Sequence, residues 1–142
     1  SDSHYLMSAR FPNAGKEYYR NMTLILAKDC TEESIKEALY AHRTIAYSAN
    51  ILIGEEELLT ELFKACVEVK KVGTDWKKLG VVVKNNSSLP FAVSKDGKNE
   101  HVVPANGTAI VYVRRGDKVL NLTVTNMLYG VGKSPKISFK LE

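Results

Sequence analysis

Residues 108–125, TAIVYVRRGDKVLNLTVT, decide the fold class of this chain. Apolar and polar residues alternate on both sides of the Arg115-Gly116-Asp117 tripeptide, which is the period of a strand with one buried face. Ala109, Val111 and Val113 therefore share one face, and we expect that face to point into a core. The tripeptide between the two runs is interpreted as a turn.

The strand pattern continues on both sides of this stretch, over residues 67–142. Further strands are expected at residues 67–70, 79–84, 89–94, 101–103 and 136–141. Asp96-Gly97 and Asn106-Gly107 are dipeptides favoured in two-residue hairpin turns, so both are predicted to close hairpins. Many short strands separated by turns indicate an antiparallel β-sandwich.

Residues 1–66 carry helix patterns as well as strand patterns. Residues 22–27 are a short apolar run that predicts a strand buried on both faces, and residues 44–47 predict a second strand. Thr31 is a good N-cap for a first helix, whose expected apolar face consists of Ile35, Ala38, Leu39 and His42. Gly54 precedes a second helix, whose expected buried side consists of Leu58, Leu59, Leu62, Phe63 and Cys66. This alternation favours a short α/β segment, so the whole chain is predicted to be α+β.

Composition and charge limit the function classes open to this chain. It has 142 residues, a net charge of +4 and two cysteines, which are too few for a disulfide framework. No apolar run approaches the roughly 20 residues that span a membrane. Residues 1–66 hold 7 Lys and Arg against 10 Asp and Glu, whereas residues 67–142 hold 13 against 6. We place a domain boundary at this change, and we interpret the lysines of the second part as solvated strand faces rather than a nucleic-acid platform.

The first four residues, Ser1-Asp2-Ser3-His4, are the candidate metal site. On an extended segment Asp2 and His4 point to the same side. Carboxylate and imidazole are both ligands of first-row divalent metals, so the pair can place two donors on one ion. A chance occurrence and a vector-derived leader are the alternatives.

Several stretches follow one another in the order found in one enzyme family. They are residues 1–4, 20–28, 33–39, 43–44 and 53–59. In this order they resemble the C-terminal end of PHP-domain (polymerase and histidinol phosphatase) metal-dependent phosphoesterases, especially members of Bacteroidetes type with a small β domain after the PHP barrel. The resemblance covers residues 1–66. Residues 67–142 fit the appended β domain by position and pattern.

The resemblance implies that residues 1–66 are the end of a PHP-type barrel. In the parent protein Asp2 and His4 would be ligands of a zinc, manganese or iron cluster that activates water against a phosphate ester. The resemblance gives Arg43 a structural role rather than a catalytic one. The family needs an H-x-H pair and further His and Glu ligands, whereas this chain has three histidines. We therefore expect an inactive C-terminal fragment that binds no metal alone. Its partners would be the N-terminal remainder of the PHP barrel and a small phosphorylated substrate.

An alternative from another function class stays open. In it the chain is a non-catalytic β-sandwich binding or structural module, and Ser1-Asp2-Ser3-His4 is incidental. No catalytic or cofactor-binding residue is assigned within the chain under either hypothesis. His42 is expected to be a packed or partly buried histidine, and Cys30 and Cys66 are expected to be free thiols, since no C-x-x-C is present. The bacterial compartment, cytoplasmic or periplasmic, is left open.

Overall fold

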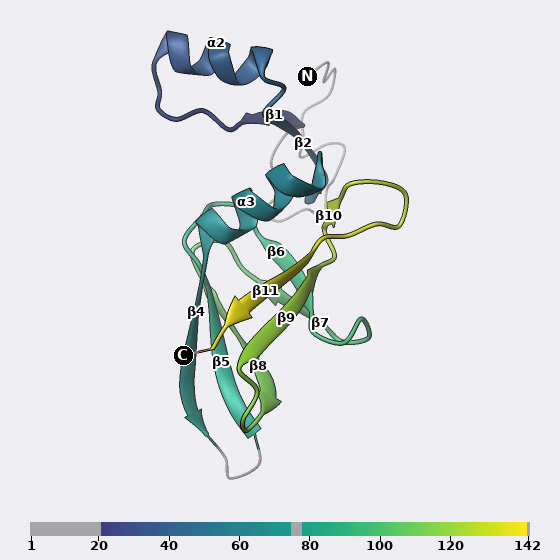
Figure 1. The fold of residues 1–142 in the computed structure, drawn as a ribbon. Coiled ribbons are helices and arrows are strands. Elements are labelled where there is room, and N and C mark those ends of the chain that lie inside the picture. The colour runs from purple at the N-terminus through teal and green to yellow at the C-terminus, as the bar shows by residue number, and fades with distance from the viewer. Residues whose placement is uncertain (1–20, 75–77, 142) are drawn as a thin grey trace, which may run out of the picture.

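The structure, a computed structural model, describes residues 21–74 and 78–141. Its first part contains β1 (Met22–Ile25), α2 (Glu32–Tyr40), β2 (Thr44–Ser48), β3 (Ile51–Ile53) and α3 (Glu56–Cys66). Its second part contains β4 (Val67–Thr74), β5 (Lys78–Asn85), β6 (Phe91–Ser94), β7 (Glu100–Val103), β8 (Thr108–Arg114), β9 (Val119–Val124), β10 (Met127–Leu128) and β11 (Lys136–Lys140). The predicted α+β class is confirmed (Figure 1).

The strands form three sheets. The sheet β1-β2-β3-β10, which we call the mixed sheet, is antiparallel except for its parallel β3–β10 pair. The sheets β11-β9-β6-β7 and β4-β5-β8 are antiparallel and form the predicted β-sandwich. In Figure 1, α2 and β1 lie at one end of the molecule, and β4, β5 and β8 extend toward the other end. β1 and β2 pair antiparallel across α2, which differs from the parallel strands of an α/β barrel.

Helix α2 begins as predicted, but its apolar face is not buried as predicted. Thr31 is the N-cap, and its Oγ1 accepts a hydrogen bond from the Ser34 N–H at 3.3 Å. Ala38 is the buried residue of this helix, whereas Ile35 and Leu39 are exposed. The predicted packed position of His42 is wrong. The helix ends at Tyr40, and His42 lies beyond it, exposed and with a φ of +57°, so it does not continue the helical face.

Two predictions about the mixed sheet also need correction. β1 is not buried on both faces, because it is an edge strand in which half-buried and exposed residues alternate. The residues Ile51–Ile53 form β3, a strand that the sequence patterns did not predict. β3 also pairs with β10, a two-residue strand more than 70 residues later. The second half of the chain therefore completes the sheet of the first half.

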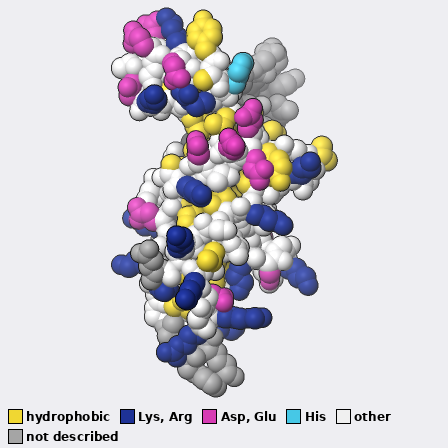
Figure 2. All heavy atoms as spheres, in the orientation of Figure 1, with side chains coloured by type: hydrophobic (Ala, Val, Ile, Leu, Met, Phe, Trp, Pro, Cys, Tyr) yellow, Lys and Arg dark blue, Asp and Glu magenta, His cyan; other side chains and the backbone are white. Residues whose placement is uncertain are grey.

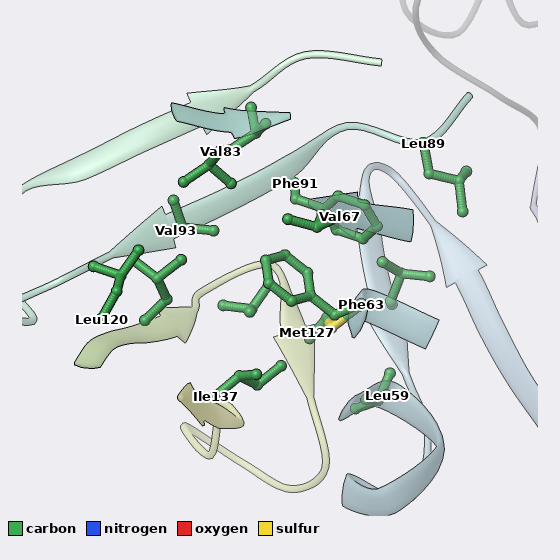
Figure 3. Close-up of a cluster of buried hydrophobic side chains, with 14 of the residues drawn as sticks. Leu59, Phe63, Val67, Val83, Leu89, Phe91, Val93, Leu120, Met127 and Ile137 are labelled. Carbon is green, nitrogen blue, oxygen red and sulfur yellow. The ribbon is translucent and has the colours of Figure 1, made fainter. Parts of the chain in front are cut away.

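The core is continuous across residue 66, where we placed the domain boundary. Phe63 of α3 is fully buried, and its ring packs edge-on against the rings of Phe91 at 5.0 Å and Phe139 at 6.1 Å between centroids. Figure 3 shows Phe63 of α3 beside Phe91 of the sandwich and Met127 of the mixed sheet. One apolar cluster runs from the mixed sheet through α3 into both sandwich sheets. The division into residues 1–66 and 67–142 stays a prediction, and its two described parts share this cluster.

Two of the predicted turns form as expected, and one does not. Gly97 has a φ of +74° in the hairpin between the paired strands β6 and β7, where the Asp96 carboxylate accepts the Lys98 and Asn99 N–H groups, each at 3.0 Å. Gly116, with a φ of +105°, forms the turn after β8. Asn106-Gly107 closes no hairpin, because it carries the chain from β7 in one sandwich sheet to β8 in the other. The predicted register of β8 is confirmed, with Val111 and Val113 buried.

Candidate functional site

The predicted metal ligands Asp2 and His4 lie outside the residues that the structure describes. Within residues 21–74 and 78–141, no group of three or more His, Cys, Asp or Glu side chains could hold a metal ion. His42 follows α2, whereas His101 lies in β7, so these two histidines belong to separate parts of the fold. The metal hypothesis therefore rests on residues 1–4 and on what the parent protein supplies.

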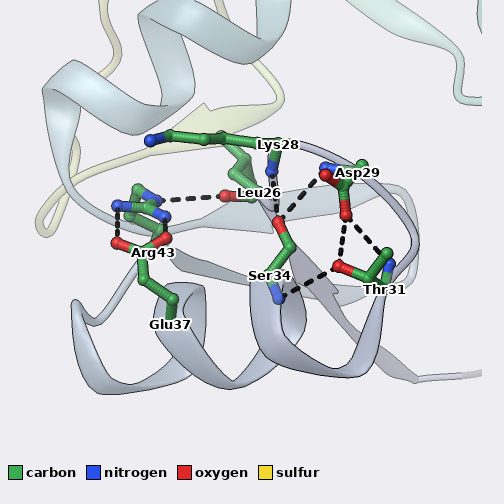
Figure 4. Close-up of polar contacts among 7 residues, drawn as sticks. All are labelled: Leu26, Lys28, Asp29, Thr31, Ser34, Glu37 and Arg43. Carbon is green, nitrogen blue, oxygen red and sulfur yellow. Dashed lines mark hydrogen bonds and ion pairs between the residues drawn. The ribbon is translucent and has the colours of Figure 1, made fainter.

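Arg43 has the structural position that the resemblance gave it. Its Nε donates to the Leu26 carbonyl oxygen at 3.1 Å, and its Nη1 donates to Glu37 Oε1 at 3.0 Å (Figure 4). The Arg43 Nη2 also forms an ion pair with the other oxygen of Glu37. These hydrogen bonds lower the pKa of the Glu37 carboxyl group and raise that of Arg43. The guanidinium thus ties the end of β1 to α2, and its donors face protein groups rather than an open site.

The start of α2 is held by a second set of polar contacts, also shown in Figure 4. The Asp29 carboxylate accepts the Thr31 N–H at 3.0 Å and the Thr31 hydroxyl, which lowers the pKa of Asp29. The Ser34 hydroxyl oxygen accepts the N–H groups of Lys28 at 3.1 Å and Asp29 at 3.2 Å. Each of these polar side chains satisfies a backbone donor near the helix N-terminus. We therefore assign them to helix capping.

Three hollows meet at Lys95, where residues from both sandwich sheets contribute to the walls. Their volumes are about 290, 270 and 140 Å³. Arg114 and Asp117 line the first, Lys136 the second, and all three include Lys95. The Lys95 Nζ donates to the Tyr112 carbonyl oxygen at 2.7 Å, which links the two sandwich sheets. The sequence patterns did not indicate this cluster, because its residues come from separate turns and strands. We assign no reaction to it.

Charge is distributed unevenly over the surface, as the sequence predicted. Figure 2 shows the acidic side chains gathered on the end with α2 and α3, and the basic side chains gathered over the sandwich. Lys78 and Arg114 are paired positions on the solvent-facing side of β5 and β8, where the exposed Ile110 and Tyr112 also lie. This face is a candidate contact surface, with apolar residues beside basic ones. No helix in the described part of the chain is long and apolar enough to cross a membrane.

Comparison with known proteins gives one informative relative. No protein-family model matches the sequence, and no curated protein matches it. The chain is similar in structure to a solved two-domain protein from Bacteroides vulgatus that contains a predicted PHP-like metal-dependent phosphoesterase. The TM-score is 0.72 at 27% sequence identity, and the match covers 87% of this chain. The match covers 39% of the solved chain, so most of that protein has no counterpart here.

Proposed function

We propose that this chain is the C-terminal region of a PHP-type metal-dependent phosphoesterase, which hydrolyses a phosphate ester with metal-activated water. The observation that supports the proposal is the fold similarity to the two-domain Bacteroides vulgatus protein over 87% of the chain. The order of stretches along residues 1–66 pointed to the same family. Residues 1–66 would then be the end of the phosphoesterase part, and residues 67–142 would be an accessory domain next to it.

Asp2 and His4 are the chain's contribution to the metal site in this proposal. Carboxylate oxygen and imidazole nitrogen suit zinc, manganese or iron, and the bound ions would supply an activated water and neutralise charge on the phosphate. Two donors from one segment leave such a cluster incomplete, because a catalytic metal site needs at least three protein ligands. The missing ligands would come from the preceding part of the parent protein, which would also bind the small phosphorylated substrate.

The test compares the 142-residue chain with the longer protein that includes the residues encoded before it. Purified proteins are assayed for release of phosphate from p-nitrophenyl phosphate with added Mn²⁺ or Zn²⁺, and their bound metal is measured by mass spectrometry. We expect activity and bound metal in the longer protein and neither in the 142-residue chain. Metal-dependent phosphate release by the 142-residue chain would overturn the claim that its ligand set is incomplete.

A pair of matched variants tests the ligand role of His4 in the longer protein. His4→Asn is expected to lower bound metal and activity together, because an amide is a poor substitute for imidazole at these ions. His42→Asn is the control, since His42 is exposed and Asn tolerates its positive φ. If His4→Asn keeps the metal content and the activity of His42→Asn, His4 is not a ligand.

The alternative, a non-catalytic binding or structural module, keeps one supporting observation. Ile110 and Tyr112 are 48% and 57% exposed on a sandwich face that also carries basic residues, a combination found in contact surfaces. The two hypotheses differ in the residues encoded upstream. An H-x-H pair and further His and Glu residues there would favour the enzyme, and an unrelated upstream domain would favour the module.

A further inference from the structure

The strand register places eight residues on one face of the mixed sheet, which we call the outer face. Thr23 pairs with Ala46, Ala46 with Ile53, and Ile53 with Leu128, so these four residues form one row across the four strands. Residues two positions away on the same strands point to the same side. The outer face therefore consists of Thr23, Ile25, Thr44, Ala46, Ser48, Ile51, Ile53 and Leu128.

This outer face carries no charged residue, and six of its eight residues are exposed. Ile25, Ile51 and Ile53 are 39%, 38% and 52% exposed, and Ala46 between them is also exposed. The other members of the face are Thr, Ser and Leu. Val131, in the loop after β10, is also fully exposed. Single exposed apolar residues are ordinary, but an uncharged sheet face to which four strands contribute five apolar residues is typical of a surface that another protein surface covers.

The opposite face of the same sheet is buried, and it serves as a comparison for the exposure of the outer face. Ile45, Tyr47, Leu52 and Met127 lie on it and are at most 1% exposed, because they pack into the main core. The solvent-facing side of the sandwich sheet β4-β5-β8 shows how a sheet face that stays in water differs from the outer face. That face carries Lys70, Lys78, Lys84 and Arg114, and charges of this kind keep an exposed sheet in water. The mixed sheet thus has one apolar face that is buried and one uncharged, largely apolar face that the described residues leave mostly exposed.

We propose that the outer face of the mixed sheet packs against the part of the parent protein that precedes this chain. This inference rests on the proposed function. Most of the solved two-domain protein lies outside the match with this chain. A corresponding part of the parent protein would be large enough to cover this face. β1 is the first described element and forms an edge of this sheet, and residues 1–20 connect it to any preceding polypeptide.

The chemistry of the face defines the partner surface. Charged residues are depleted from the centre of stable interfaces, where uncharged apolar groups of both partners meet. A surface of aliphatic or aromatic side chains therefore fits, and an acidic or basic surface does not.

The test measures the accessibility of single cysteines in the longer protein and in the 142-residue chain. Ile53→Cys reports on the outer face, and Ile110→Cys is the matched control, an isoleucine of similar exposure on the sandwich face. Each variant is treated with N-ethylmaleimide, and labelling at the engineered position is followed by peptide mass spectrometry. We expect labelling of Ile53→Cys to be at least about tenfold slower in the longer protein than in the 142-residue chain. Labelling of Ile110→Cys should be equal in the two.

The outcomes separate the proposal from its alternatives. Equal labelling of Ile53→Cys in the two proteins would overturn it. Slow labelling in the 142-residue chain, with the mass of a dimer in solution, would also overturn it and make a second copy the occupant. Should Ile53→Cys fail to fold, Ala46→Cys tests the same row with a smaller change. Protection at Ile53→Cys in a longer protein without phosphoesterase activity would support the interface and contradict the proposed function, so the two can fail separately.

Discussion

Replacing Phe63 by alanine tests whether α3 and the sandwich unfold as one unit. The Phe63 side chain is fully buried, and its ring contacts those of Phe91 and Phe139, both beyond residue 66. Truncation of a buried phenylalanine to alanine costs about 3–5 kcal/mol, because contacts are lost and a cavity remains. With an unfolding entropy of roughly 2 cal/mol/K per residue, a chain of this length loses about 10–18 °C in Tm.

The assay is differential scanning calorimetry of the 142-residue chain and of the Phe63→Ala variant. We expect one transition in each protein, with equal calorimetric and van't Hoff enthalpies, shifted down as a whole in the variant. Tyr112→Ala is the control, since this aromatic side chain is 57% exposed. Substitutions at exposed positions usually change stability by less than about 0.5 kcal/mol. The Tm of Tyr112→Ala should therefore stay within about 2 °C of that of the unsubstituted 142-residue chain.

A split transition would refute the reasoning. If the sandwich of Phe63→Ala melted at the original temperature while an earlier transition appeared, the core contacts across residue 66 would not couple the two parts. That result would favour two domains divided near residue 66. A single transition with an unchanged Tm would show that Phe63 is not packed as described.

Three further substitutions test the sandwich and its turns. Val111→Asp places a charge in the core and is expected to abolish cooperative thermal unfolding. Ile110→Asp, on the exposed side of the same strand, should change the free energy of unfolding in urea titration by less than about 0.5 kcal/mol. Equal stability of the two variants would mean that the β8 register is wrong. Asn85→Asp turns a carboxylate toward the carbonyl oxygens of Leu89 and Pro104, which now accept the Asn85 amide at 2.7 and 3.0 Å. Because this setting raises the pKa of the new carboxyl group, stability should be higher near pH 4 and fall by roughly 2–4 kcal/mol toward pH 7; a flat pH profile would contradict this. Two backbone N–H groups lower the pKa of Asp96 to about 2, so its contribution is present above pH 4 and lost as the pH falls toward 2. The Tm difference between Asp96→Ala and the unsubstituted 142-residue chain should therefore shrink over that pH range. A constant difference would mean that the Asp96 charge does not contribute to stability.

Local patterns were sufficient for most strands of the sandwich. β5, β8, β9 and β11 each match a predicted run to within about two residues, because alternation with period two is a property of the local sequence. The N-cap at Thr31 and the hairpin at Asp96-Gly97 were also predictable, since each depends on side chains that bond to a backbone only two or three residues away.

Pairing between distant segments was not predictable in the same way. Asn106-Gly107 has the chemistry of a hairpin turn, but β8 pairs with β5, so the turn joins two sheets instead. β10 is two residues long, too short to show any period, and it exists as a strand because β3 lies beside it. The sequence did contain a hint of β3, since Ile51-Leu52-Ile53 is an apolar run with two β-branched residues before Gly54.

Local sequence patterns were enough for the α+β class, the alternating faces of the sandwich strands and the separation of an acidic part from a basic part. They also supplied Asp2 and His4 as a hypothesis, because the type and spacing of two donors are local properties. Tertiary structure alone decided that Phe63 joins the parts across residue 66 and that β3 pairs with β10. The same pairing created an uncharged outer face around Ile53, since a sheet face is formed only when separate strands come together in one register.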